Sequence, residues 1–250
     1  MKSTLIAVLA LACATVLTPA SADTSRGKGK SFCGSLDNAY GPFDYRRAFT
    51  DYVENIRLVE SAHFNETVKN GISGISGKLG DDLDYTLRAF PNHHEALTTI
   101  ANVSLRDKVH TIPGGKRPVE CYFERALRFT PDDGAVYATY GNYLYALGQT
   151  DRAQQMFIQA VKLLPDNPAV NYNMGLSYFR TKQYDKANQF AQQAYALGFP
   201  LPGLKNMLVG VGKWDTSVPV RTPEKREEDD DAEPKAEAKT DGAAPAAKQE

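Results

Sequence analysis

Residues 134–167 read GAVYATYGNYLYALGQTDRAQQMFIQAVKLLPDN, and residues 168–200 read PAVNYNMGLSYFRTKQYDKANQFAQQAYALGFP. The second stretch repeats the pattern of the first after 34 residues, with large and small side chains alternating at matching positions. Self-similarity at this period predicts a helix–turn–helix unit that buries its apolar face only by stacking on neighbouring units. The matched residues are Tyr137, Tyr140, Gly141, Leu144, Ala153, Phe157, Ala160 and Pro165 in the first copy, and Met174, Gly175, Tyr178, Ala187 and Ala194 in the second.

The small residues in this pattern predict how the helices interlock. Gly141 and Gly175 would let two helix backbones approach closely, and the matched alanines would make room for aromatic rings. The pattern resembles the tetratricopeptide repeat (TPR). This resemblance implies an all-α fold, a solenoid of helical hairpins, and a scaffold that binds a protein or peptide partner.

A third, less regular repeat lies upstream. When Pro91 is aligned with Pro131, Leu97 and Ile100 fall at the core positions of the first repeat helix. The spacing is 40 residues rather than 34, and the six extra residues belong to the loop His110–Arg117. We expect a repeat domain over residues 83–215, with repeats at about 94–133, 134–167 and 168–201 and a capping helix at about 202–210.

The N-terminus has the features of an export signal over residues 1–22. Lys2 precedes an apolar run from Leu5 to Val16, and Ala20-Ser21-Ala22 resembles a cleavage site. We therefore expect a periplasmic protein cleaved after Ala22. The alternative is an outer-membrane lipoprotein acylated at Cys13. The apolar run is too short to cross a bilayer, and no second long apolar run exists, so we expect no transmembrane segment.

Residues 23–82 are expected to form an irregular N-terminal strap followed by a helical segment. Cleavage after Ala22 leaves two cysteines, Cys33 and Cys121, and an even count in an exported chain favours a disulfide. Two unpaired thiols are the alternative. The repeat register places Cys121 off the packed face. Helical spacing runs from Phe49 to about residue 68, with a break at residues 63–65 and Asn65 as the cap of a second helix.

The start of the repeat domain carries further local predictions. Residues 83–90 read as a short helix stopped by Pro91, with one of the aspartates at 81, 82 and 84 as its cap. Asn92 and Glu95 form a capping box for the next helix. Glycines at every third position from 71 to 80 read as a flexible connection, since no phosphate-loop context surrounds them.

The order of three segments along the chain carries a second resemblance. Residues 33–45 read CGSLDNAYGPFDY, residues 83–94 read LDYTLRAFPNHH, and the repeats follow. This order resembles a group of exported bacterial TPR proteins with no assigned biochemical role. The resemblance supports the architecture and implies no particular activity.

Charge is distributed unevenly along the chain. Residues 221–250 hold 10 acidic and 6 basic residues, which leaves 20 acidic and 23 basic residues upstream. A body so nearly balanced gives no electrostatic reason to expect a nucleic-acid partner. Residues 216–250 are rich in Pro, Ala, Glu, Asp and Lys, and we expect a disordered acidic tail.

The sequence contains no strong catalytic or metal-binding motif. His93 and His94 are adjacent and diverge by about 100° on a helix, so they cannot face one metal, and we expect no metal, no cofactor and no enzyme. An enzyme with a site between the strap and the first repeat, near Asp44, His63 and His93, is the least favoured alternative. Another alternative is that the protein is a structural component of an envelope assembly, tethered by its acidic tail.

The TPR resemblance indicates where a partner would bind, because the first helices of such repeats line a concave groove. Asparagine can pair with a peptide backbone, since its amide both donates and accepts. The carboxylate-clamp subclass expects a lysine where this chain has Ala138, so recognition of a C-terminal carboxylate is not expected. The alternative is that the asparagines are ordinary solvated residues. The predicted partner-binding residues are Asn102, Asn142, Tyr145, Tyr172, Asn173, Phe179 and Arg180.

Overall fold

The computed structural model of the protein describes residues 32–75 and 77–220. The predicted signal peptide with Cys13, and the tail from residue 221, lie outside the described residues. In the described part all regular structure is helical, which confirms the all-α prediction. The elements are η1 (Tyr45–Arg47), α1 (Val53–His63), α2 (Glu66–Lys69), α3 (Leu79–Ala89), α4 (His94–Asp107), α5 (Val119–Phe129), α6 (Gly134–Ala146), α7 (Thr150–Leu163), α8 (Pro168–Arg180), α9 (Tyr184–Ala196) and α10 (Gly203–Gly210).

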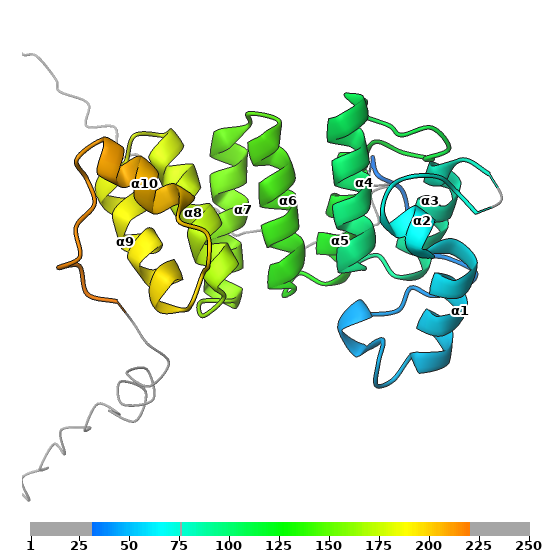
Figure 1. Ribbon diagram of the computed structural model, residues 1–250. Helices are drawn as coiled ribbons and strands as arrows, with labels where there is room; N and C mark the ends of the chain where they lie inside the picture. Colours follow the sequence, from blue (N-terminus) through cyan, green and yellow to red (C-terminus); the bar gives the residue numbers. More distant parts are fainter. Residues whose placement is uncertain (1–31, 76, 221–250) are drawn as a thin grey trace, which may run out of the picture. The chain divides into compact units, whose positions relative to one another are not determined.

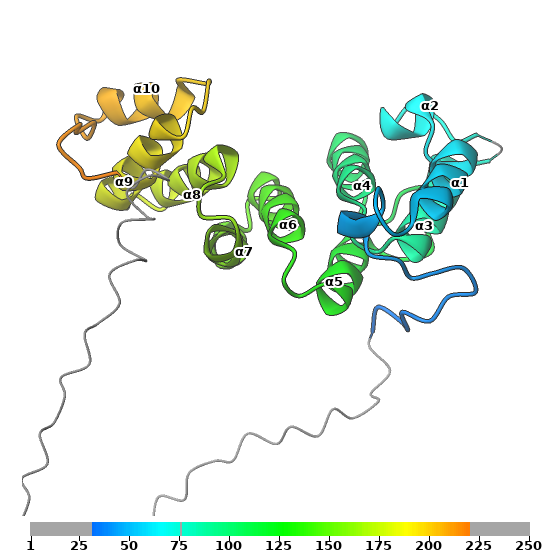
Figure 2. The same ribbon diagram turned by 90° about the horizontal axis from the view of Figure 1, so that it is seen from below.

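The two clean sequence repeats form the hairpins α6–α7 and α8–α9, and α4 packs beside α6 (Figure 1). Figure 2 shows the same stack from below, with α6 next to α7. Gly141 is a point of close packing inside the first hairpin, because a Cβ there would lie 2.6 Å from the Phe157 ring. Asp133 and Asn167 begin α6 and α8 by accepting hydrogen bonds from N–H groups of the first turn.

One apolar core runs through the repeats and a smaller one closes their C-terminal end. In the smaller core, α10 packs against α8 and α9, and Leu204 and Leu208 are completely buried. Gly198, with φ +87°, ends the last repeat helix before the chain turns into α10. None of the described helices is long and apolar enough to pass through a membrane.

The N-terminal segment has its own core. Ile56, Val59 and Phe90 are buried there, and tyrosine and phenylalanine rings of the strap pack around them. The predicted helix break is confirmed, since α1 ends at His63 and Asn65 caps α2. The predicted helix start at Phe49 is wrong. The chain first makes the 3₁₀ turn η1, so α1 begins at Val53.

Two predicted helix caps are also wrong. α3 begins at Leu79, with no side-chain cap, and the aspartates expected to cap it lie within the helix. The N-cap of α4 is His93 rather than Asn92, because its Nδ1 accepts the Ala96 N–H at 3.2 Å. Asp82, Asp84 and Asn92 are buried and make tertiary hydrogen bonds instead. Asp81 pairs with Lys116 at the surface.

The loop inserted between α4 and α5 covers α3. Gly80 N donates to the Pro113 carbonyl at 3.1 Å, and Ile112 is buried. A Cβ on Gly80 would lie 2.3 Å from the Gly115 nitrogen, so only glycine allows this close approach. The last of the spaced glycines is therefore a packing position. The loop therefore packs closely on the start of α3.

The strap is joined to α5 by a disulfide between Cys33 and Cys121. Next to it, Arg128 Nη2 donates to the Gly34 carbonyl at 2.7 Å, and Arg125 donates to the Ser35 carbonyl. Cys121 is only 3% exposed, but it does not belong to the apolar core of the repeats. The strap covers it on a separate face of α5, in keeping with the prediction that it points off the packed face.

Candidate functional site

The predicted partner-binding residues lie on α4, α6 and α8, which are the first helices of the successive hairpins. Asn102 on α4, Asn142 on α6 and Arg180 on α8 are exposed, whereas Tyr145 and Asn173 are half-buried. α6 lies between the other two helices in sequence and packs against both. The exposed amides and the guanidinium therefore belong to neighbouring helices of one stack.

Two of these residues meet directly. Arg180 Nη1 donates to the Tyr145 carbonyl at 3.0 Å, and its guanidinium carbon lies 4.6 Å from the centre of the Tyr145 ring. A cation held over an aromatic face keeps both groups in place at low entropic cost on binding. The pair links α6 to α8 at the predicted groove.

Tyr172 and Phe179 are half-buried, which corrects the prediction that both rings are exposed. Tyr172 stacks on Phe199 with a centroid distance of 4.0 Å, and its hydroxyl accepts the Leu204 N–H at 3.2 Å. Phe179 is half-buried, with its ring 5.2 Å from that of Tyr184. The turn into α10 folds back over α8, and repeat register alone gives no position for that turn.

The histidines that the sequence suggested for an enzyme site are bonded to separate carboxylates. His63 Nδ1 lies 2.9 Å from Asp82 Oδ1, and His93 Nε2 lies 3.2 Å from Glu60 Oε1. Asp44 instead accepts from Asn92 Nδ2 at 2.8 Å. The described residues contain no group of three or more His, Cys, Asp or Glu side chains placed to hold a metal ion.

His93 is the most unusual of these groups. Its ring is completely buried and stacks on Tyr45 with centroids 4.1 Å apart. Burial lowers the pKa of His93, against the opposing effect of the hydrogen bond to Glu60. Because Nδ1 accepts from the α4 backbone, the neutral ring carries its proton on Nε2 and donates it to Glu60. These contacts are structural, since they leave neither ring nitrogen for a substrate.

A polar cluster that the sequence did not predict lies beside the disulfide. Arg152 Nη2 donates to Glu120 Oε2 and to the Tyr140 hydroxyl, both at 2.8 Å. The hydrogen bond from Arg152 lowers the pKa of Glu120, and burial together with that carboxylate raises the pKa of Tyr140 to about 12. The cluster borders a cavity of about 470 Å³ next to Cys33. Its charges neutralise one another, so it holds α5, α6 and α7 together.

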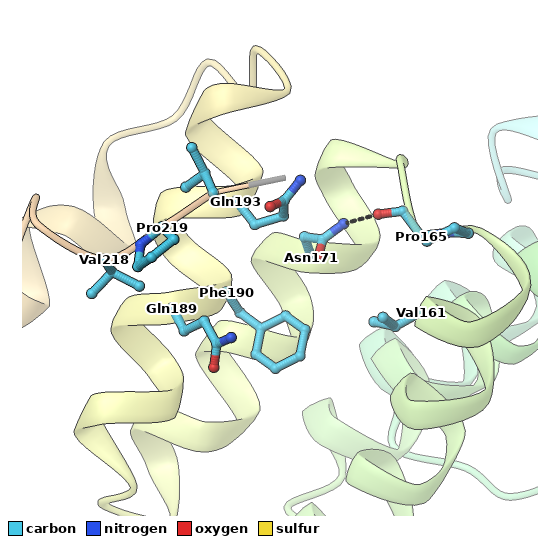
Figure 3. Close-up of a pocket in the computed structure, with 9 residues that line it drawn as sticks. Val161, Pro165, Asn171, Gln189, Phe190, Gln193, Val218 and Pro219 are labelled. Carbon is cyan, nitrogen blue, oxygen red and sulfur yellow. Dashed lines mark hydrogen bonds between the residues drawn. The ribbon is translucent and has the colours of Figure 1, made fainter. Parts of the chain in front are cut away.

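A second cavity, of about 420 Å³, opens between α7, α8 and α9 and is bordered by residues 218–220 (Figure 3). The sequence did not predict this cavity, because residues from Thr216 onward were interpreted as a disordered tail. For residues 216–220 that interpretation does not hold. Val218 and Val220 are half-buried, and the chain at Asp215 is hydrogen-bonded to α9.

These observations define a class of protein: a stack of helical hairpins with polar groups on its first helices. Three family models match the chain, a TPR repeat at residues 141–182 and two tetratricopeptide repeats at residues 122–155 and 168–197. Residues 122–197 of the chain therefore match tetratricopeptide repeats. Such repeats are scaffolds for protein–protein interaction and typically carry no enzymatic activity. A comparison with curated proteins found no matching sequence.

Proposed function

We propose that this protein is an exported, periplasmic scaffold that binds an extended segment of a protein partner along α4, α6 and α8. The observation that carries the proposal is the pair of exposed amides, Asn102 and Asn142, on helices that pack side by side. An exposed amide can donate to a backbone carbonyl and accept from a backbone N–H. Beyond them, the Arg180–Tyr145 pair offers the aromatic and guanidinium groups enriched at interfaces.

The test is a comparison of partners recovered from periplasmic extract. The full-length wild type and the variant Asn102→Ala/Asn142→Ala are used as baits, with Gln155→Ala as a matched control on the exposed face of α7. We expect the double variant to lose partners that the wild type and the control retain. Equal recovery by all three baits would refute binding along these helices.

Export has a separate test. The proposal rests on the sequence Lys2, the apolar run Leu5–Val16 and Ala20-Ser21-Ala22, and on the two cysteines being paired. Mass spectrometry of the mature N-terminus, after expression with the native leader, should find Asp23 as the first residue. A diacylglyceryl group on Cys13 would replace the periplasmic assignment with a lipid-anchored one.

A further inference from the structure

Helix α10 and the turns at its two ends leave part of their apolar surface uncovered. Leu204 and Leu208 are completely buried, because α10 packs against α8 and α9 (Figure 1). Single exposed apolar residues are ordinary on a protein surface, whereas several on one short segment indicate an interaction surface. The large apolar residues exposed on this segment are Leu201 at 60%, Val209 at 55%, Val211 at 43% and Met207 at 39%.

Two lysines frame these apolar residues. Lys205 lies in the first turn of α10, and Lys213 follows the end of the helix, where its N–H donates to the Leu208 carbonyl at 2.8 Å. Both lysine side chains are exposed. Residues 199–214 read FPLPGLKNMLVGVGKW, so the two lysines are the charged side chains of this stretch. We call the four exposed apolar residues and the two lysines the α10 surface.

Neighbouring segments add further charges beside Lys213. Lys182 in the turn before α9 and Lys186 in its first turn border a cavity of about 360 Å³ together with Lys213. Two exposed aspartates oppose them, since Asp185 Oδ1 lies 3.5 Å from Lys213 Nζ and Asp215 follows shortly after in the chain. With Lys205 included, the lysines outnumber these aspartates, and the described surroundings of α10 are positively charged.

Trp214 lies at the edge of the α10 surface. Its ring is half-buried, with its centre 5.9 Å from that of the Tyr195 ring and 5.3 Å from Lys205 Nζ. Tryptophan and tyrosine rings are enriched where proteins meet the boundary between a membrane and water. Lysine suits the same place, because its stem is apolar while its ammonium group stays in water.

We propose that the α10 surface binds the surface of a membrane that contains anionic phospholipids. The exposed apolar side chains enter the boundary between headgroups and acyl chains, and Lys205 and Lys213 stay beside the headgroup phosphates. Lipid fits this surface better than protein does, because lysine is depleted where proteins contact one another. Two-fold pairing of α10 with a second copy would also bring like charges together. The α10 surface shares no residue with the proposed partner-binding surface, so this inference does not depend on the proposed function.

The first experiment measures binding of the full-length protein to vesicles at low ionic strength. One set of vesicles contains phosphatidylglycerol and phosphatidylcholine in equal parts, and the other contains phosphatidylcholine alone. Trp214 is the only tryptophan of the chain, so quenching by lipids with brominated acyl chains reports whether this surface enters the bilayer. We expect binding at least about tenfold tighter to the anionic vesicles, with quenching, and a loss of binding as salt is added.

Apolar variants test the contact with the acyl chains. Val209→Ser/Val211→Ser should weaken binding to anionic vesicles by at least about tenfold, because less apolar surface leaves water. Leu201→Ser, which lies before the helix and leaves it unchanged, should weaken binding by about threefold. The matched control is Ile158→Ser on α7, since Ile158 is also exposed, and this variant should bind as the wild type does.

Lysine variants test the contact with the headgroups. Lys205→Gln/Lys213→Gln should weaken binding to anionic vesicles by about tenfold and should flatten its dependence on salt. Lys162→Gln, at an exposed position of α7, is the matched control and should change neither. Thermal unfolding of every variant shows that the fold is retained.

The proposal is overturned if the protein binds both kinds of vesicle equally or binds neither, or if the variants of the α10 surface behave like their controls. Other occupants have their own readouts. A dimer in sedimentation equilibrium that Val209→Ser/Val211→Ser dissociates would assign this surface to a second copy of the chain. With p-benzoylphenylalanine at position 209, a photo-crosslink to residues 221–250 in the presence of anionic vesicles would assign it to the acidic tail. Either result overturns lipid binding, whereas a crosslink to lipid supports it.

Discussion

Removing the Cys33–Cys121 disulfide should strongly destabilise the protein. The bridge closes a loop with a sequence separation of 88 residues. In the chain-entropy model, a loop of this length restricts the unfolded chain by about 4–5 kcal/mol at 25 °C. Alanine at both positions suits the perturbation, since Cys121 is buried and a small apolar residue introduces no unsatisfied polar group.

The assay is urea unfolding followed by far-UV circular dichroism. With a denaturant slope of about 2 kcal/mol per molar urea, the Cys33→Ala/Cys121→Ala variant should unfold about 2 M earlier than the oxidised wild type. The reduced wild type is the matched control, because it loses the same loop constraint without any change of sequence. Its midpoint should lie close to that of the variant.

A midpoint shift below about 0.5 M in both the variant and the reduced wild type would refute the loop-closure argument. A large shift in the variant alone would assign the loss to packing at α5 rather than to the bridge. In either case the strap would be held by its own contacts, such as the hydrogen bonds from Arg125 and Arg128 to its backbone.

Three further changes test other parts of the fold. Gly141→Ala should destabilise by about 1–3 kcal/mol in thermal unfolding, because the new Cβ overlaps the Phe157 ring, and Phe157→Leu in the same chain should recover part of the loss. The folded-state pKa of His93 is lowered by burial, so the unfolded chain binds more protons and stability should fall as the pH drops below about 6.5; His93→Asn should flatten that part of the stability–pH profile. Asp133→Ala should cost about 2–4 kcal/mol, against about 1 kcal/mol for Asn167→Ala, because Asp133 is both a cap and a buried hydrogen-bond acceptor. Equal losses for the two cap variants would show that the buried bonds contribute nothing.

The sequence predicted those parts of the fold that depend on contacts between neighbouring helices. Gly141 and Phe157 are 16 residues apart, and their pairing follows from a period visible in the chain. The N-terminal half obeys different constraints. Asp84 accepts from Tyr122 at 2.7 Å and from Arg117 at 2.9 Å, residues more than 30 positions away. No local pattern distinguishes such a buried carboxylate from a helix cap, which is why the predicted cap was wrong.

For the candidate sites too, the sequence predicted what depends on the repeat pattern and missed what depends on long-range contacts. Repeat register placed Asn102 and Asn142 on exposed helix faces, as the structure has them. It placed Tyr172 there too, although the turn into α10 covers that ring. The cavity beside α9 depends on a chain reversal after α10, and the amide residues involved in it look in sequence like ordinary solvated positions of a surface helix. The repeat pattern predicts where helices form, but it does not predict where the chain folds back onto earlier helices.

The bonding of Asp133 also has a mechanical consequence. This carboxylate caps α6 while accepting from Asn92 at 2.8 Å and His94 at 2.9 Å, so the start of α6 is tied to the start of α4. At the opposite end, α10 is held by the buried Leu204 and Leu208 side chains and by the hydrogen bond from the Leu204 N–H to the Tyr172 hydroxyl. The start of α6 should resist bending relative to the start of α4, because a change of angle there would break the buried hydrogen bond from Asn92 to Asp133.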